Sequence, residues 1–266
     1  MMMRLEDIQV IFNEHTPLEN MALKKINLTI REGEFVTVIG TNGAGKSTLL
    51  NVISGNAETT AGKIFINNED VTFKSVSDRA RLVARVFQDP MVGTCESLTI
   101  EENLALAYDR GNTSLGLKPA INKERREIFR EHLSILKLGL ENRLEDSMGL
   151  LSGGQRQAIS LLMSSLQPSK ILLLDEHTAA LDPKTAAFVL KLTEEIVKKN
   201  QLTTMMVTHS MQQALSYGNR TIMLHQGEIV LDVSGEMREN LSISDLLLLF
   251  EQSRGDKVED DALLLG

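Results

Sequence analysis

Eight consecutive residues, Gly40 to Ser47, have the types and spacing that bind phosphate groups. The run Gly-Thr-Asn-Gly-Ala-Gly-Lys-Ser fits G-x-x-x-x-G-K-[ST] at every fixed position. The glycines would let backbone N–H groups point at phosphate oxygens, Lys46 would neutralise the β- and γ-phosphates, and Ser47 would bind Mg²⁺. A glycine-rich turn with an incidental lysine is the alternative, which the apolar run before the motif disfavours. The predicted nucleotide contacts are Gly40, Thr41, Asn42, Gly43, Ala44, Gly45, Lys46, Ser47 and Thr48.

The chain lacks the motif that proteins with this loop use to recognise guanine. Guanine-specific proteins with this loop usually carry Asn-Lys-x-Asp, and the nearest run here, Asn122-Lys123-Glu124-Arg125, lacks the Asp. ATP is therefore favoured.

Two carboxylates follow an apolar run in the second half of the chain. Ile171–Leu174 is succeeded by Asp175 and Glu176. In a parallel α/β sheet, ligands gather at the carboxyl ends of the strands, where these acids would lie. We expect Asp175 to hold Mg²⁺ and Glu176 to polarise the attacking water. In isolation the pair could simply open a polar loop, but the phosphate loop favours the catalytic interpretation.

A second anion-binding helix start is predicted at Leu-Ser-Gly-Gly-Gln, residues 151–155, called the signature loop below. Ser152 would cap the helix, and Gly153 and Gly154 would leave its first backbone N–H groups accessible. With the phosphate loop and the Asp-Glu pair, this segment makes the chain resemble the nucleotide-binding subunit of an ATP-binding cassette (ABC) transporter, over about residues 5–233.

The resemblance implies an ATPase that uses ATP and Mg²⁺ and works as a head-to-tail homodimer. In that family the signature loop acts on the nucleotide bound by the other subunit. A D-loop, here residues 179–182, also reaches the partner. The residues expected to make these contacts between subunits are Ser152, Gly153, Gly154, Gln155 and Asp182.

The resemblance assigns three more residues to the site. Gln88 matches a glutamine that contacts Mg²⁺ and the attacking water, and His209 matches a histidine that contacts the γ-phosphate and orients Glu176. Phe12 stands where an aromatic ring stacks on adenine, with a place in the core as the alternative. The predicted catalytic residues are thus Glu176, His209 and Gln88, and the predicted metal ligands are Ser47, Gln88 and Asp175.

Two positions depart from the family pattern. Ala179 replaces a usual Ser, which removes a hydroxyl that would bond across the dimer. His177 replaces a usual Pro beside Glu176. We expect a neutral, surface-exposed His177; an effect on the geometry of the loop is the alternative.

The order of elements predicts how these residues are positioned. β-rich runs flank the phosphate loop, helical periodicity dominates residues 100–167, and strand and helix alternate afterwards, with a helix starting at Asp182-Pro183. We expect an α/β P-loop NTPase of ABC type: a mixed sheet core, an N-terminal antiparallel β subdomain and an inserted helical subdomain. The predicted domain is 1–240, with core 1–88 and 160–240 and insertion 89–159; residues 241–266 form a helix and an acidic tail.

Composition limits the partners. The net charge of −8 and sequence pI of about 5.3 argue against broad nucleic-acid binding. Apolar runs do not exceed five residues, against the roughly 20 of a membrane-spanning helix. The single Cys95 and the acidic N-terminus suggest the cytoplasm.

The resemblance completes the predicted setting. We expect a peripheral protein on the inner face of the cell membrane that pairs with permease subunits. The branch of the family implies a bacterial importer with an extracellular solute-binding protein and amino acids as cargo. A soluble ABC ATPase of DNA repair or translation, and a non-hydrolysing ATP-binding regulatory module, are the alternatives.

Overall fold

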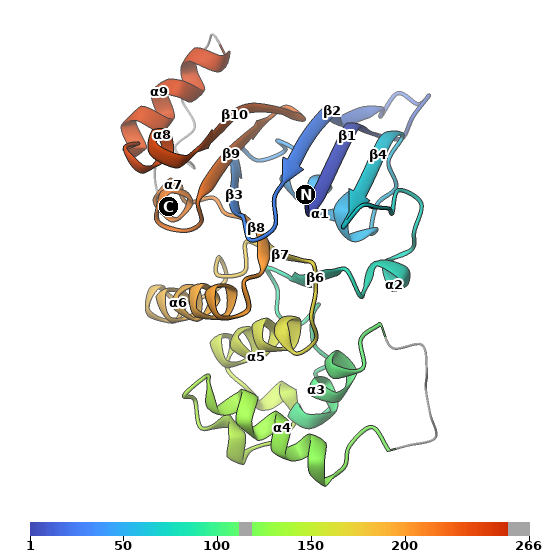
Figure 1. The fold of residues 1–266 in the computed structure, drawn as a ribbon, viewed down its shortest axis with the longest axis vertical. Helices are drawn as coiled ribbons and strands as arrows, with labels where there is room; N and C mark the ends of the chain where they lie inside the picture. The colour runs from blue at the N-terminus through green and yellow to red at the C-terminus, as the bar shows by residue number, and fades with distance from the viewer. Residues whose placement is uncertain (112–118, 255–266) are drawn as a thin grey trace.

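A computed structural model describes residues 1–111 and 119–254 of the chain, and a six-stranded sheet lies at its centre (Figure 1). Its strand order is β10-β9-β3-β8-β7-β6, with all neighbours parallel except β10, which runs antiparallel to β9. The strands are β3 (Phe35–Gly40), β6 (Val83–Val86), β7 (Ile171–Asp175), β8 (Thr203–Val207), β9 (Arg220–His225) and β10 (Glu228–Ser234).

A second, antiparallel sheet stands beside the first (Figure 1). Its order is β2-β1-β4-β5, formed by β1 (Met3–Phe12), β2 (Asn20–Ile30), β4 (Ala61–Ile66) and β5 (Glu69–Asp70). Helix α1 (Lys46–Ser54) follows β3, and its apolar side chains share one buried cluster with both sheets. The phosphate loop is thereby held between two sheets.

Strand β7 shows why the central sheet is covered on both faces. Side chains alternate between the faces of a strand. Ile171 and Leu173 enter the cluster around α1, whereas Leu172 and Leu174 enter a second cluster with the helices on the opposite face. Those helices are α3 (Ile100–Tyr108), α4 (Lys123–Ser134), α5 (Gly153–Ser165) and α6 (Pro183–Asn200).

Short helices complete the described fold. They are α2 (Val76–Arg79), α7 (Met211–Ser216), α8 (Gly235–Glu239) and the 3-10 turns η1 (Leu140–Asn142) and η2 (Met148–Leu150). Helix α9 (Ile243–Arg254) packs Leu246 and Phe250 onto a third buried cluster with Ile39. The expected acidic tail lies outside the described residues.

The predicted architecture is confirmed: a mixed α/β sheet core carries an antiparallel N-terminal sheet and an inserted helical part. Within residues 1–111 and 119–254, the longest apolar stretches of helix fall short of what crossing a bilayer requires.

Candidate functional site

Four neighbouring parallel strands, β3, β8, β7 and β6, place the predicted site residues at one edge of the sheet. The phosphate loop follows β3, Glu176 follows β7, His209 lies two residues beyond β8, and Gln88 lies two residues beyond β6. Because the strands are parallel, their carboxyl ends meet at the same edge. The sheet therefore gathers residues that are up to 169 positions apart in the sequence, from Gly40 to His209.

The phosphate loop turns into α1 without a side-chain cap. Gly45 occupies the N-cap position with φ of 102°, and no side chain accepts a hydrogen bond from the first turn. A Cβ on Gly45 would lie 2.7 Å from the carbonyl oxygen of Ala22, so only glycine fits there. The first N–H groups of α1 are thus left for an anion.

Lys46 holds the loop closed. Its side chain is 5% exposed and donates to the carbonyl oxygens of Gly40 at 2.8 Å and Thr41 at 3.1 Å. Burial lowers the pKa of Lys46, and the nearby charges of Glu176 and Asp175 act in the opposite direction. The ammonium group is therefore a desolvated cation that phosphate oxygens would stabilise.

The register between β7 and β8 brings Glu176, the predicted base, to His209, the histidine predicted to orient it. Asp175 pairs with Val207, and the N–H of Glu176 donates to the carbonyl oxygen of Val207 at 3.1 Å. Two residues beyond Val207, Nε2 of His209 lies 2.6 Å from Oε1 of Glu176. The Glu176 side chain is only 10% exposed, whereas the His209 side chain is 40% exposed and faces solvent.

These groups line one cavity of about 270 Å³. Phe12 stands at its rim with 41% exposure, which places the ring where a base could stack and excludes the core alternative. Asn20 and Ala22, which we did not predict from the sequence, also line it. The full lining is Phe12, Asn20, Ala22, Asn42, Gly43, Ala44, Gly45, Lys46, Ser47, Thr48, Glu176 and His209.

Asp175 is paired with an arginine that the sequence analysis missed. Nη2 of Arg85, on β6, lies 2.6 Å from Oδ2 of Asp175, and Nη1 donates to Asn51 on α1 at 2.7 Å. Both partners of the ion pair are nearly buried, so the carboxylate is held in place rather than solvated.

The oxygen atoms of Ser47 and Asp175 suit Mg²⁺, which needs few protein ligands, better than a metal ion that is bound by side chains alone. Within the described parts of the chain, groups of three or more His, Cys, Asp or Glu side chains that could enclose a metal ion do not occur. Mg²⁺ is commonly held by one or two protein oxygens together with substrate phosphates and water. One hydroxyl and one carboxylate beside a phosphate loop match that pattern.

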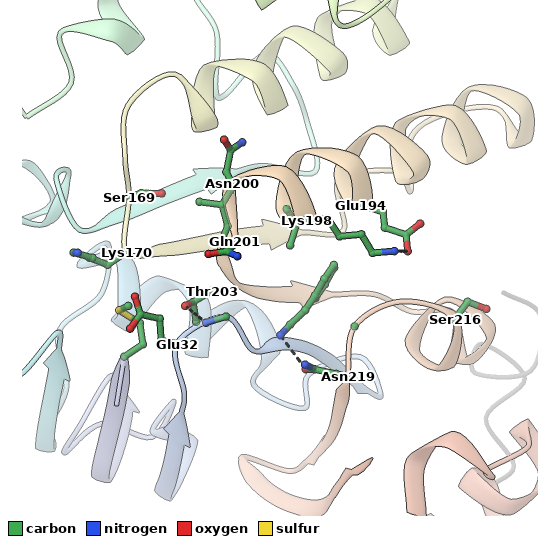
Figure 2. A pocket seen from close by; sticks show the side chains of 16 residues that line it. Glu32, Ser169, Lys170, Glu194, Lys198, Asn200, Gln201, Thr203, Ser216 and Asn219 are labelled. Carbon is green, nitrogen blue, oxygen red and sulfur yellow. Dashed lines mark hydrogen bonds and ion pairs between the residues drawn. The ribbon is translucent and has the colours of Figure 1, made fainter. Parts of the chain in front are cut away.

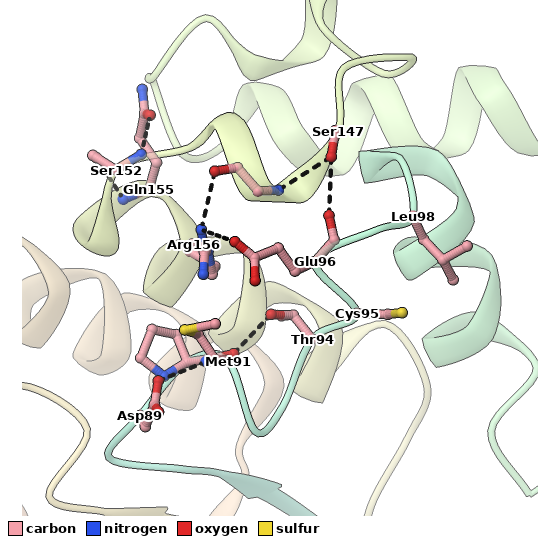
Figure 3. A network of polar contacts seen from close by, with 12 residues as sticks. Asp89, Met91, Thr94, Cys95, Glu96, Leu98, Ser147, Ser152, Gln155 and Arg156 are labelled. Atoms are coloured by element: carbon pink, nitrogen blue, oxygen red, sulfur yellow. Dashed lines mark hydrogen bonds and ion pairs between the residues drawn. The ribbon is translucent and has the colours of Figure 1, made fainter.

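The signature loop lies outside the phosphate cavity, at the start of α5. The Ser152 hydroxyl accepts from the N–H of Gln155, and Oε1 of Gln155 accepts from the N–H of Ser152 at 3.1 Å (Figure 3). The Gln155 side chain is therefore engaged within its own subunit. Ser152, Gly153 and Asp182 are exposed.

Backbone contacts tie the segment after β6 to the segment before the signature loop (Figure 3). The carbonyl oxygen of Glu96 accepts from Ser147 Oγ at 2.9 Å and from Gly149 N–H at 3.1 Å. Buried Gln157 on α5 donates to the carbonyl oxygen of Phe87 at 3.1 Å, directly before Gln88. Gln88 itself is exposed and is not among the residues that line the phosphate cavity.

The expectation of an exposed His177 is wrong. Its side chain is 2% exposed, and Nε2 lies 2.9 Å from Oγ1 of Thr193 on α6. Thr193 Oγ1 donates to the carbonyl oxygen of Val189, so Nε2 of His177 is the donor in their contact. Burial lowers the pKa of His177 to about 4, which keeps the ring neutral.

A larger cavity, of about 790 Å³, lies at the opposite edge of the sheet. It is lined by residues at the amino ends of β3 and β8, including Phe35 and Thr203, and by the end of α6 (Figure 2). Lys198 there is already paired with Glu194 at 2.8 Å. The phosphate loop and carboxylates are at the other ends of these strands, so size does not identify the reactive site.

Known proteins resemble this arrangement over nearly its whole length. Residues 23–179 match the family model described as ABC transporter. A tyrosine transport ATP-binding protein of Clostridioides difficile (strain R20291) is 45% identical over 94% of this chain and 99% of its own length. An energy-coupling factor transporter ATP-binding protein of Caldanaerobacter subterraneus subsp. tengcongensis is 36% identical over 87% of this chain and 78% of its own.

The structural likeness is equally broad. A dimeric ATP-binding cassette in a post-hydrolysis state, bound to ADP and Pi, has a TM-score of 0.75 and 29% identity. The match covers 88% of this chain and 98% of that one.

Proposed function

Since the chain belongs to the ABC transporter family, in which it is an ATP-hydrolysing cassette, we propose that it powers a bacterial importer of an amino acid or a similar small solute. The observation that carries the hydrolytic part of the proposal is the contact between Glu176 and His209 in the phosphate-loop cavity. In the proposed complex, Glu176 would act as the base and His209 as its orienting group beside the γ-phosphate.

In the proposed hydrolysis, the chain's own residues supply position and charge. Phosphate oxygens would replace the carbonyl partners of Lys46, and the bare N–H groups of α1 would bind the same anion. Glu176 would accept a hydrogen bond from the attacking water while His209 keeps its carboxylate oriented. Phe12 would stack on the adenine ring.

Ser47 and Asp175 are the proposed ligands of Mg²⁺, with Gln88 joining when its segment moves inward. The ion would neutralise charge on the phosphate oxygens. Arg85 keeps Asp175 in place at the end of β7, so the metal-binding oxygen is prepositioned.

We propose that two copies close head to tail around two ATP molecules. Ser152, Gly153, Gly154, Gln155 and Asp182 would then meet the nucleotide and loops of the other copy. The dimeric cassette among the similar structures supports this assembly. The domain would run over residues 1–240, with the insertion at 89–159.

The permease is proposed to dock in a groove between the core and the helical insertion. A hollow of about 430 Å³ lies there, between the elements around β6 and the insertion. The exposed apolar side chains of Val76, Val92 and Leu106, 49–64% exposed, line its mouth. Such a surface fits an apolar helix face from a membrane protein.

The proposed cargo follows from the names of relatives. The 45% identical protein is named for tyrosine transport, so we propose an aromatic amino acid, delivered by an extracellular solute-binding protein. The chain would work at the inner face of the cell membrane. A role in DNA repair or translation is disfavoured by these transport relatives, and a non-hydrolysing module by Glu176 and His209.

Replacing Glu176 by Gln tests hydrolysis. We expect phosphate release to fall at least about 100-fold, and a stable dimer to appear on size exclusion with ATP. Glu194→Gln, which removes one side of a surface ion pair, is the matched control and should retain wild-type activity. Wild-type turnover by Glu176→Gln would show that Glu176 is not the base.

Uptake of labelled tyrosine by cells lacking the chain tests transport. Uptake should be lost on deletion, restored by the wild-type chain and not by Lys46→Ala. Unchanged uptake of tyrosine and other amino acids in the deletion strain would contradict the cargo.

A further inference from the structure

Gly154 of the signature loop is a glycine for a reason inside its own subunit. Its φ lies outside the left-handed region, so its backbone conformation does not require glycine. A Cβ at Gly154, however, would lie 2.1 Å from Cγ2 of Thr185 on α6. The Thr185 methyl group therefore fills the space that a side chain at 154 would need.

The neighbouring glycine behaves differently. A Cβ at Gly153 would meet only Cδ2 of Leu181, at 3.8 Å, which is an ordinary van der Waals contact. A methyl group at 154 would thus require the Thr185 side chain to shift, whereas a methyl group at 153 would require no neighbour to move. The two positions form a matched pair in which one residue contacts α6 and the other does not.

Thr185 also belongs to the start of α6. Its N–H donates to Oδ1 of Asp182, the N-cap of α6 and last residue of the D-loop, at 3.1 Å. Hydrogen bonds from Thr185 lower the pKa of Asp182, so this carboxylate stays charged. Thr185 therefore contacts both loops: its N–H bonds to Asp182, and its methyl group packs on Gly154. The two contacts lie where α5 and α6 pack together (Figure 1).

We propose that Thr185 is a positioning residue for ATP hydrolysis. Its methyl group, seated on the bare backbone of Gly154, fixes the D-loop against the signature loop of the same subunit. The two loops then approach the partner as one rigid unit. The proposal rests on the proposed function only in taking these loops as the parts that reach the partner.

Thermal unfolding of nucleotide-free variants tests the contact. Gly154→Ala should lower the Tm by roughly 3–10 °C, because it forces a methyl into a filled space. Adding Thr185→Ser removes Cγ2 and should return the Tm to that of Thr185→Ser alone. Thr193→Ser, the same chemical change elsewhere on α6, should not rescue Gly154→Ala. Gly153→Ala should leave the Tm unchanged.

A failure of Thr185→Ser to rescue, or an equal loss in Gly153→Ala, would overturn the contact. These measurements need neither nucleotide nor dimer, so they stand even if the proposed function fails. If the proposed function were wrong, the wild-type protein would instead show no ATP hydrolysis.

Steady-state kinetics of Thr185→Ser alone tests positioning. With the loops loosened, kcat should fall roughly tenfold, whereas KM for ATP should stay within about twofold because the phosphate loop is untouched. Thr185→Val keeps the methyl group but removes the hydroxyl that also bonds to Asp182, so its kcat should stay well above that of Thr185→Ser. Wild-type kcat in Thr185→Ser would show that the residue is merely structural.

Discussion

Glu176 has a backbone φ of 46°, in the left-handed region that non-glycine residues rarely occupy. Such a conformation costs on the order of 1 kcal/mol or more, and it persists only where neighbours enforce it. Here the N–H of Glu176 is bonded to Val207 and its carbonyl oxygen to the N–H of Ala179. With this backbone conformation, the carboxylate of Glu176 contacts His209.

The chemical types at the site could be predicted from sequence, because each motif fixes residue type and spacing together. Contacts between motifs could not. The pairing of Asp175 with Arg85 depends on β6 lying beside β7, and the burial of His177 depends on how α6 crosses the loop. Neither the pairing of β6 with β7 nor the path of α6 produces a periodic pattern of residues in the sequence.

His177 gives a prediction about pH. Its pKa is lowered to about 4, against 6.5 when unfolded, so the unfolded chain binds the proton more tightly. The free energy of unfolding should therefore fall by about 1.4 kcal/mol per pH unit below 6.5, to a total of about 3 kcal/mol at pH 4. Urea unfolding between pH 7.5 and 5 should show this slope in wild type and in His15→Gln, an exposed control. His177→Gln should be shallower; parallel curves would contradict the assignment.

Phe12 gives a prediction about base binding. Removing the ring with Phe12→Ala should raise KM for ATP roughly tenfold, since base–aromatic stacking contributes about 1–3 kcal/mol. Phe12→Tyr keeps the π face and should bind ATP normally. Equal affinities of all three proteins for a fluorescent ATP analogue would show that the ring does not touch the base.

At the scale of elements, buried arginines bind the carboxyl ends of two helices that start near the phosphate-loop cavity. Helix α1 starts at the phosphate loop, and the carbonyl oxygens of Val52 and Ile53 near its end accept from Arg79. Helix α7 starts just after His209, and Arg238 donates to carbonyl oxygens at its end. Cations are favourable at carboxyl ends of helices.

Helices and strands were predicted best where the periodic pattern of apolar residues was uninterrupted. The helix expected to start at Asp182-Pro183 is confirmed, because α6 begins at Pro183 with Asp182 as its N-cap. The pattern of strand β1 is harder to recognise in the sequence. Its buried residues run Met3, Leu5, Ile8 and Val10, because a bulge at Asp7 shifts the alternation by one residue. Helices α2, α7 and α8 span only four to six residues, too few for a helical period to show.

Arg238 gives a prediction about stability. It is 8% exposed and donates to Ala214, Leu215, Tyr217 and Thr221. Arg238→Ala should lower the free energy of unfolding by about 2–4 kcal/mol, because several buried acceptors lose their donor. Arg130→Ala, in an exposed i,i+3 ion pair with Glu127, should cost less than about 1 kcal/mol. Chemical denaturation that ranks the two variants equally would contradict the capping role.

At the scale of the whole molecule, the separation of the signature loop from the phosphate cavity matters most. The cavity is lined by residues of β1, β2 and the phosphate loop and by residues that follow β7 and β8, whereas Ser152 stands at the start of α5, within the expected insertion. The order of motifs could predict the fold class, but the domain bounds remain a prediction. The expected limit at 159–160 falls within α5, which packs against both the insertion and α6.

Mixing two inactive variants tests whether the site is shared between subunits. Lys46→Ala disables phosphate binding, and Ser152→Arg blocks the signature loop. In a mixed two-fold dimer, both lesions fall on one composite site and leave the other intact. Equimolar mixing should therefore restore roughly a quarter of wild-type phosphate release, since half of the dimers are mixed and each has one working site. The double variant Lys46→Ala/Ser152→Arg, mixed with Lys46→Ala, should stay inactive. If each site were complete within one subunit, mixing would restore nothing, because every subunit would still carry a lesion.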